Sequence, residues 1–469
     1  MGVIDILSSV SKMLPTIKPP ERPPSTNERL TWTAITLIIF FIMYHVTVIG
    51  VSSKFESIDF LQTITASKIG SLLTAGIGPI VLASIFLQLF VGAKLINLNL
   101  QDKNDRKKFH EAQKVLAIIL ALVEAAIFVF TSRVFLVPVV GGFTPLIVVF
   151  QIALGSIILQ YLDEIVSKYG IGSGISLFIA AGVSVAVIGG LMNLIGGAGG
   201  VVEVMATGGA EAIPGALLVL LPFIFTILVF LIVVYAEGIK VEIPIAFEQV
   251  RGMSPKLPLK FFYVSNIPVI FASALLLNVQ LFATMLAGKS LEIGGFDIIK
   301  AIGFVDSSNQ LRDGLLYLLT PVYAGRGTVA HWNLLTSAVT PIFGIPEWAH
   351  AAIYILFLSV VSILFGLFWV ETSNMDARSV AGQLGNSGLQ IPGFRRDPRM
   401  LEGILNKHIL PLTVLGSFSV GLLAGLADLT GALGTGTGIL LTVGILYRVY
   451  EQMEQMKMFD LYPSLGKIF

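Results

Sequence analysis

The sequence contains no cysteine, and this absence removes several kinds of chemistry from consideration. Disulfide bonds, iron–sulfur clusters and thiol catalysis all require a cysteine sulfur. Charged residues are also scarce, at 13% of 469 residues, where soluble domains carry about 25%. A chain this poor in charge, and 55% hydrophobic, does not cover a water-facing surface in the ordinary way. The composition therefore indicates a membrane protein.

The N-terminus also lacks the basic start and long apolar core of a cleavable signal peptide. Apolar residues instead recur at helical spacing, which predicts a short amphipathic helix of the kind that lies on a membrane surface. These residues are Val3, Ile6, Leu7, Val10, Met13 and Leu14. Four prolines between residues 19 and 24 then end this segment, and residues 1–29 are assigned to it.

Ten apolar segments follow, and most are close to the length of about 20 residues that crosses a bilayer as a helix. The first five are Leu30–Val48, Gly76–Gly92, Val115–Ser132, Thr144–Tyr161 and Ile171–Leu194. The other five are Gly215–Tyr235, Tyr263–Leu286, Ala351–Val370, Ile409–Leu426 and Gly436–Tyr447. The predicted fold class is an all-α membrane protein with ten transmembrane helices.

Lysine and arginine are distributed unequally between the two sets of loops. With a cytoplasmic N-terminus, the cytoplasmic segments carry 23 of these residues and the outer loops carry 7. Positive residues are retained on the cytoplasmic side, so both termini are predicted to be cytoplasmic.

A weak internal repeat relates the two sets of five spans. Gly170–Ile175 opens the fifth span and Gly434–Ile439 opens the tenth, with Gly at the same three positions. Ile77–Val81 in the second span is echoed by Ile267–Ile270 in the seventh. Because five is odd, the two halves must enter the membrane from opposite sides, as in an inverted repeat around a central pathway. The alternative is coincidence in a glycine-rich chain.

Catalytic motifs find little support in the sequence. His110 and Glu111 begin like a zinc-protease helix, but the position that needs the second histidine is Lys114. His45, alone in the first span, is explained by a buried histidine with a hydrogen bond. The glycine triplets follow no strand, which argues against a dinucleotide site.

Carboxylates near the spans have two different explanations. Asp163 and Glu164 sit where the fourth span meets the cytoplasm, so a solvated helix end accounts for them. Glu124 falls inside the third span, where a carboxylate is costly and is a functional candidate. Its alternative role is a protonated or hydrogen-bonded packing residue, with Asn278 and Gln280 as candidate partners.

Bulky aliphatic residues flank the breaks in the second, fifth, seventh and tenth spans. The pairs within one span are four residues apart and share a helix face. The residues are Ile77, Val81, Ile175, Ile179, Ile270 and Leu441. Together they would form a narrow apolar constriction that stops ions by dewetting. Ordinary packing is the alternative, and spacing alone favours it.

Several longer segments resemble the SecY family, the channel subunits of the Sec translocon. They are Tyr161–Ile175, Gln62–Gly70, Gly76–Val81, Phe261–Pro268 and Phe368–Thr372. The last two are similar to the archaeal and eukaryotic branch. The similarity runs from the first span to residues 450–452, which is nearly the whole chain.

The resemblance implies two five-helix halves, residues 30–200 and 201–456, that hinge after the fifth span and open like a clamshell, with a cytoplasmic tail at 457–469. It implies that the six aliphatic residues form a pore ring and that a plug, about residues 59–69, seals the outer side. The plug residues would be Phe60, Leu61, Ile64 and Ile69. A lateral gate would open between the second and third spans and the seventh and eighth, with Glu124, Asn278 and Gln280 as its polar residues.

The resemblance also implies partners and a location. These are two small single-span subunits of the SecE and Sec-beta kinds, ribosomes with nascent chains, signal sequences and lipid, in the cell membrane and without a cofactor. Ribosome contacts would come from the loops after the sixth and eighth spans, through Lys240, Arg251, Arg395, Arg396 and Arg399. The sixth-span loop is less basic than is usual in the family, and orientation alone could explain these charges.

Two other functions fit parts of the sequence. A secondary transporter with five-plus-five inverted repeats would need a polar site at the midplane, whereas aliphatic residues flank these breaks. An intramembrane enzyme would need a second catalytic group beside Glu124, and the sequence offers no convincing one. The outer segment 288–348 yields no prediction.

Overall fold

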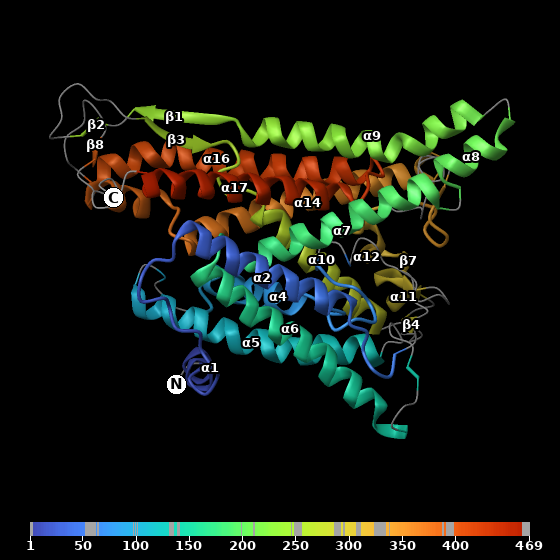
Figure 1. The fold of residues 1–469 in the computed structure, drawn as a ribbon, viewed down its shortest axis with the longest axis horizontal. Helices are drawn as coiled ribbons and strands as arrows, with labels where there is room; N and C mark the ends of the chain where they lie inside the picture. The colour runs from blue at the N-terminus through green and yellow to red at the C-terminus, as the bar shows by residue number, and fades with distance from the viewer. Residues whose placement is uncertain are drawn as a thin grey trace.

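The computed structural model describes most of the chain as a bundle of long helices (Figure 1). The described residues are 3–51, 62, 65–96, 98, 100, 102–130, 136–137, 141–197, 199–209, 212–244, 246–247, 256–285, 292–293, 296–305, 311–322, 334–336, 338–386, 389–390 and 398–461.

Ten helices in this part of the chain have 15 residues or more. They are α2 (Thr26–His45), α4 (Gly78–Gly92), α5 (Lys103–Phe130), α6 (Thr144–Tyr169), α7 (Gly174–Gly196), α9 (Ala212–Glu237), α10 (Ile267–Met285), α14 (Glu347–Thr372), α16 (Pro398–Asp428) and α17 (Gly436–Leu461). Six of them, α5, α6, α7, α9, α14 and α16, are individually long and apolar enough to cross a membrane, and α4 and α10 are shorter apolar helices. The ten helices match the ten predicted spans in order, and the predicted fold class is confirmed.

Several helices extend beyond the predicted spans at their predicted cytoplasmic ends. α5 begins at Lys103 instead of Val115, and α17 continues to Leu461 instead of ending at Tyr447. These extra turns are rich in Lys, Arg, Glu, Gln and Met, which favour helix in water. Hydropathy locates only the lipid-facing part of a helix, so it gave spans that were too short.

The helices pack in two groups that meet in the middle of the bundle. α4, α5 and α6 contact one another in sequence, as do α10, α14 and α16, and α17 contacts both α7 and α9. Figure 1 shows α9, α14, α16 and α17 on one side of the bundle and α2, α4, α5 and α6 on the other. The largest apolar cluster draws residues from both groups, including Leu159 of α6 and Phe365 of α14. It also contains Phe40 of α2, stacked on Phe178 of α7 at 5.1 Å between ring centres.

Short elements decorate both ends of the bundle. They are α1 (Val3–Ser11), η1 (Gly141–Phe143), α8 (Val201–Thr207), α11 (Ile298–Ile302), α12 (Leu315–Leu318) and α15 (Ala377–Asn386). Four antiparallel strand pairs join them: β1 (Lys240–Pro244) with β3 (Lys256–Lys260), β2 (Ala246–Phe247) with β8 (Leu389–Gln390), β4 (Glu292–Ile293) with β5 (Phe296–Asp297), and β6 (Phe304–Val305) with β7 (Leu311–Asp313). The β2–β8 pair links the loop after α9 to the loop after α15. The pairs β1–β3 and β2–β8 lie at one end of the bundle and β4 and β7 at the other (Figure 1).

The N-terminal amphipathic helix packs against the bundle, a contact that the sequence did not predict. Ile4 of α1 is buried in an apolar cluster with Leu87 and Phe109. Lys108 Nζ of α5 lies 3.1 Å from Asp5 Oδ1. The prediction assigned this helix to a membrane surface, whereas the structure places one of its faces against α4 and α5.

Candidate pore and lateral seam

Two long helices, α4 and α10, begin with a proline as their second residue. These prolines are Pro79 and Pro268. Proline is tolerated in the first turn because the backbone N–H groups there have no intrahelical acceptor. Aligning the two prolines matches Val81 of α4 with Ile270 of α10, which supports the predicted relation between the second and seventh spans.

The other repeated pair, α7 and α17, begins two residues after a glycine in the left-handed conformation. Gly172 has φ +75° and Gly434 has φ +72°, and the helices start at Gly174 and Gly436. Glycine adopts this conformation without the strain that a side chain brings, so these two glycines fix the helix starts. The structural match is therefore Gly172 with Gly434. The predicted alignment, which paired Gly170 with Gly434, was wrong by two residues.

The six aliphatic residues predicted for the ring lie in one apolar cluster. Ile77, Val81, Ile179, Ile270 and Leu441 are buried in it, and the partly buried Ile175 packs against it. They come from α4, α7, α10 and α17, and the helix starts match Ile179 with Leu441. The structure thus brings residues of both repeats together. Their role as the narrowest part of a pore stays a prediction.

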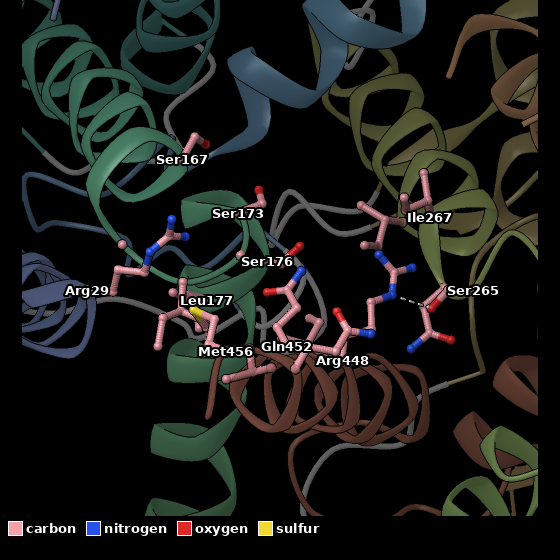
Figure 2. Close-up of a pocket in the computed structure, with 18 residues that line it drawn as sticks. Arg29, Ser167, Ser173, Ser176, Leu177, Ser265, Ile267, Arg448, Gln452 and Met456 are labelled. Atoms are coloured by element: carbon pink, nitrogen blue, oxygen red, sulfur yellow. Dashed lines mark hydrogen bonds between the residues drawn. The ribbon is translucent and has the colours of Figure 1, made fainter. Parts of the chain in front are cut away.

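A pocket of about 490 Å³ opens beside one of these residues, Ile270. Figure 2 shows its polar lining, with Arg29 on one side and Arg448 on the other. Arg448 Nε donates to Ser265 Oγ at 2.9 Å. The sequence analysis singled out neither arginine as a site residue. The signal for Arg448 is its place directly after Tyr447, where an apolar span ends but the helix continues.

Asn266, the residue directly before α10, ties that helix to α17. Its Nδ2 donates to the carbonyl oxygens of Leu440 at 3.1 Å and Leu441 at 3.4 Å. A Cβ at Gly444 would lie 1.9 Å from this nitrogen, so only glycine lets the amide reach the α17 backbone. Asn266 therefore connects two helices that carry predicted ring residues, and no pattern in the sequence predicts this contact.

The predicted plug is only partly described. Ile69 is buried. Phe60, Leu61 and Ile64 lie outside the described residues. The carbonyl oxygen of Thr65 accepts a hydrogen bond from the backbone N–H of Ile77 at 2.9 Å. A residue within the predicted plug segment is thus bonded directly to a predicted ring residue.

Glu124 lies where α5 meets the start of α4. The residue is buried, at 2% exposure. Its Oε2 lies 2.9 Å from the position of a Cβ at Gly78, so the carboxylate rests against the α4 backbone. Among the described residues, Oε1 has no hydrogen-bond partner. A buried oxygen without a partner is costly, which keeps Glu124 a functional candidate.

The other two predicted gate residues lie on α10 and do not hydrogen-bond to Glu124. Asn278 Nδ2 donates to the carbonyl oxygen of Ala274 in its own helix at 2.9 Å. Asn278 Oδ1 and Gln280 Nε2 have no partner among the described residues. α10 contacts both α4 and α5, and α14 contacts α4. These contacts form a seam between the second and third spans and the seventh and eighth.

Two of the five predicted ribosome-binding residues lie in the described part of the chain. Lys240 is exposed at the start of β1, 3.6 Å from Glu451, and Arg399 is exposed on the first turn of α16. Arg399 also lines a pocket of about 680 Å³ together with Arg106 and Arg378. The remaining predicted residues, Arg251, Arg395 and Arg396, lie outside the described residues.

The structure corrects the non-functional explanations that the sequence analysis offered for His45 and Asp163. His45 does bond to the carbonyl oxygen of Phe41 at 2.9 Å, but it is exposed, because α2 ends there. Asp163 is not a solvated helix end: it is partly buried, and its Oδ1 accepts from the backbone N–H of Ile175 at 2.9 Å. Glu164 pairs with Lys114 at 2.9 Å and with a lysine of its own helix.

Comparisons with known proteins agree with this geometry. Residues 71–450 match the family model described as SecY. The protein translocase subunit SecY of Methanococcus vannielii is 41% identical over 462 residues, which cover 98% of each chain. Two solved structures are similar over 100% of both chains at 39% identity: a protein-conducting channel, with a TM-score of 0.80, and Sec61 in the canine ribosome–channel complex from the endoplasmic reticulum, with a TM-score of 0.76. The chain, a multi-pass membrane protein, therefore belongs to the SecY family of protein-conducting channel subunits.

Proposed function

We propose that this chain forms the conduit of a Sec translocon, moves unfolded polypeptides between α4, α7, α10 and α17, and releases apolar segments sideways into lipid. The observation that carries the proposal is the gathering of six aliphatic residues from these four helices beside a polar pocket. Family membership favours this channel function over the secondary transporter that the repeats alone left open.

Aliphatic side chains suit a seal through which any sequence must pass. Water is unfavourable inside a narrow apolar constriction, and an ion there would lose its hydration with nothing in return. The same side chains offer no hydrogen bonds that would retain a passing polypeptide. The plug would block the same path in series, which is supported by the bond between Thr65 and Ile77.

Ion conductance of purified channels in a planar bilayer tests the ring. Replacing Ile77, Ile175 and Ile270 together with Asn should wet the constriction and raise conductance, and deleting residues 59–69 should raise it further. Ile85→Asn is the matched control, because Ile85 is equally buried in α4 but is not a ring residue. A triple variant without its plug that leaks no more than the Ile85 variant would contradict the ring assignment.

Lateral release would use the seam of α4 and α5 with α10 and α14. Glu124 and Asn278 support this, since each has a buried oxygen at the boundary between the halves that finds no partner within the described part of the chain. The halves, residues 30–200 and 201–456, would turn about the connection between α7 and α8. Replacing Glu124 with Gln should change how apolar a signal sequence must be for insertion. Unchanged insertion across signals of graded hydropathy would remove Glu124 from the gate.

Two small single-span subunits, of the SecE and Sec-beta kinds, would complete the complex in the cell membrane. The exposure of α9 supports such partners, because only 11% of its most apolar stretch is buried within the chain. Copurification from membranes tests the association: loss of both subunits in mild detergent would contradict it.

Ribosomes would bind the cytoplasmic loops after α9 and α15, with both chain termini on that side. Charge reversal at Arg395 and Arg396 should weaken ribosome binding and flatten its salt dependence, since fewer phosphate counterions would be released. Lys407→Glu is the matched control, an exposed cation further along α16. An equal salt dependence of ribosome affinity for the original chain and the double variant would contradict this assignment.

A further inference from the structure

The last long helix of each repeat is held at its first turn by a carboxylate from the long helix before it. Asp163 of α6 accepts from the backbone N–H of Ile175 at 2.9 Å and from Ser173 Oγ at 3.4 Å, at the start of α7. Asp428 of α16 accepts from the backbone N–H of Thr437 at 2.8 Å and from its hydroxyl at 2.5 Å, at the start of α17. The same carboxylate contact therefore joins the fourth span to the fifth and the ninth span to the tenth.

Glycine allows the close approach on which both contacts depend. A Cβ at Gly174 would lie 2.6 Å from the Cα of Asp163. A Cβ at Gly436 would lie 2.0 Å from the backbone carbon of Ala427. A side chain at either position would push the two helices apart.

Each carboxylate acts within one helical turn of predicted ring residues. Asp163 bonds to the N–H of Ile175 itself, and Ile179 follows one turn later. Leu441 follows one turn after Thr437. The first N–H groups of a helix have no acceptor in their own helix, and the hydrocarbon core of a membrane holds no water to replace one. An acceptor fixed on a neighbouring helix thus determines where the helix starts and which way its side chains face.

We propose that Asp163 and Asp428 are positioning residues of the pore seal, each orienting the aliphatic ring residues of the helix that it caps. This inference rests on the proposed function of the ring. It assigns the two carboxylates to the seal rather than to solvated helix ends or to general stability.

The experiment measures ion conductance in planar bilayers for paired variants. Asp163→Ala removes the acceptor, whereas Asp163→Asn keeps the oxygen that accepts from Ile175. Loss of such a cap shifts an equilibrium by about fivefold, so we expect about fivefold more leak from the Ala variant and near-original leak from the Asn variant. Asp428→Ala and Asp428→Asn should behave in the same way.

Two controls separate positioning from general damage. Asp102→Ala removes a cap of α5, where Asp102 Oδ2 accepts from Asn104 N at 3.1 Å, and α5 carries no ring residue. Gly174→Ala adds only a methyl group against Asp163, whereas Gly189→Ala adds one into open space on the same helix. We expect leak from Gly174→Ala and none from Gly189→Ala or Asp102→Ala.

The outcomes distinguish this inference from the proposed function. If the triple Asn ring variant leaks but neither Asp163→Ala nor Gly174→Ala does, the carboxylates do not position the seal. The assignment of the ring residues is then kept. If Asp163→Asn leaks as much as Asp163→Ala, the positioning bond is likewise refuted. If Asp163→Ala fails to fold, the ion leak of Gly174→Ala is compared with that of Gly189→Ala, and equal leak from the two refutes the inference. If the ring variant itself stays tight without its plug, the proposed function fails first.

Discussion

A buried histidine holds the segment between α10 and α14 against the bundle. His350 is fully buried, and its Nε2 donates to the carbonyl oxygen of Thr320 at 2.9 Å. Its Nδ1 lies 2.7 Å from Glu347 Oε2, and the Tyr317 hydroxyl donates to Glu347 Oε1 at 3.0 Å. Burial and the Glu347 carboxylate raise the pKa of the Tyr317 phenol above its ordinary value, so the hydroxyl stays a donor. Three side chains thus hold residues 311–322 against the first turn of α14.

Replacing His350 with Ala should loosen this segment without disturbing the rest of the bundle. The change leaves the Thr320 carbonyl and the Glu347 carboxylate without their histidine partner, at about 1–3 kcal/mol for each buried group. Hydrogen exchange should therefore quicken in residues 311–322 and stay slow in the middle of α14. His45→Ala is the control, since His45 is exposed and its Nδ1 bonds to the carbonyl oxygen of Phe41 in its own helix. Identical exchange in the two variants would mean that His350 does not hold the segment.

At the scale of helices, the sequence predicts the segments that face lipid. It does not predict features that depend on contacts between residues far apart in the chain. Hydropathy located all ten spans, and four-residue spacing identified Ile175 and Ile179 as one helix face. The polar turns of α5 and the β2–β8 pair were missed, because neither depends on lipid. Asn266 was also missed, since its partners lie 174 and 175 residues away. Such contacts are set by the packing of the whole bundle, and no local pattern in the sequence encodes them.

The helix α1 offers a test of how an amphipathic segment is held. Ile4 is buried against α4 and α5, whereas Ile6 is 53% exposed. If packing on the bundle holds α1, Ile4→Asp should release it, because a buried carboxylate without a partner is costly. Ile6→Asp should have little effect on that contact. Trypsin cleavage after Lys12 in proteoliposomes measures the release. Faster cleavage in the Ile6 variant than in the Ile4 variant would indicate that the membrane surface holds the helix.

At the scale of the whole molecule, the two halves touch along two seams on different helices. On one seam α4 meets α14, where a Cβ at Gly92 would lie 2.5 Å from Phe368 Cδ1. On the other, α7 meets the segment before α17, where a Cβ at Gly190 would lie 3.6 Å from the Cβ of Leu433. A clamshell that turns about the connection after α7 would part the first seam and leave the second nearly still.

Disulfides placed in each seam distinguish these two motions, and the absence of native cysteine leaves only the introduced pair to react. A disulfide needs about 3.5–4.5 Å between Cβ atoms, and the Gly190 and Leu433 positions meet this requirement. A Cβ at Gly92 would lie 3.3 Å from Phe368 Cγ, the atom bonded to the Phe368 Cβ. We expect the oxidised Gly92→Cys/Phe368→Cys channel to stop inserting apolar segments into lipid, because its seam no longer opens. The oxidised Gly190→Cys/Leu433→Cys channel should still insert them, and reduction should restore the first. Insertion of a model membrane protein into proteoliposomes measures both. If the first locked channel inserts as well as the second, the path into lipid does not run between α4 and α14.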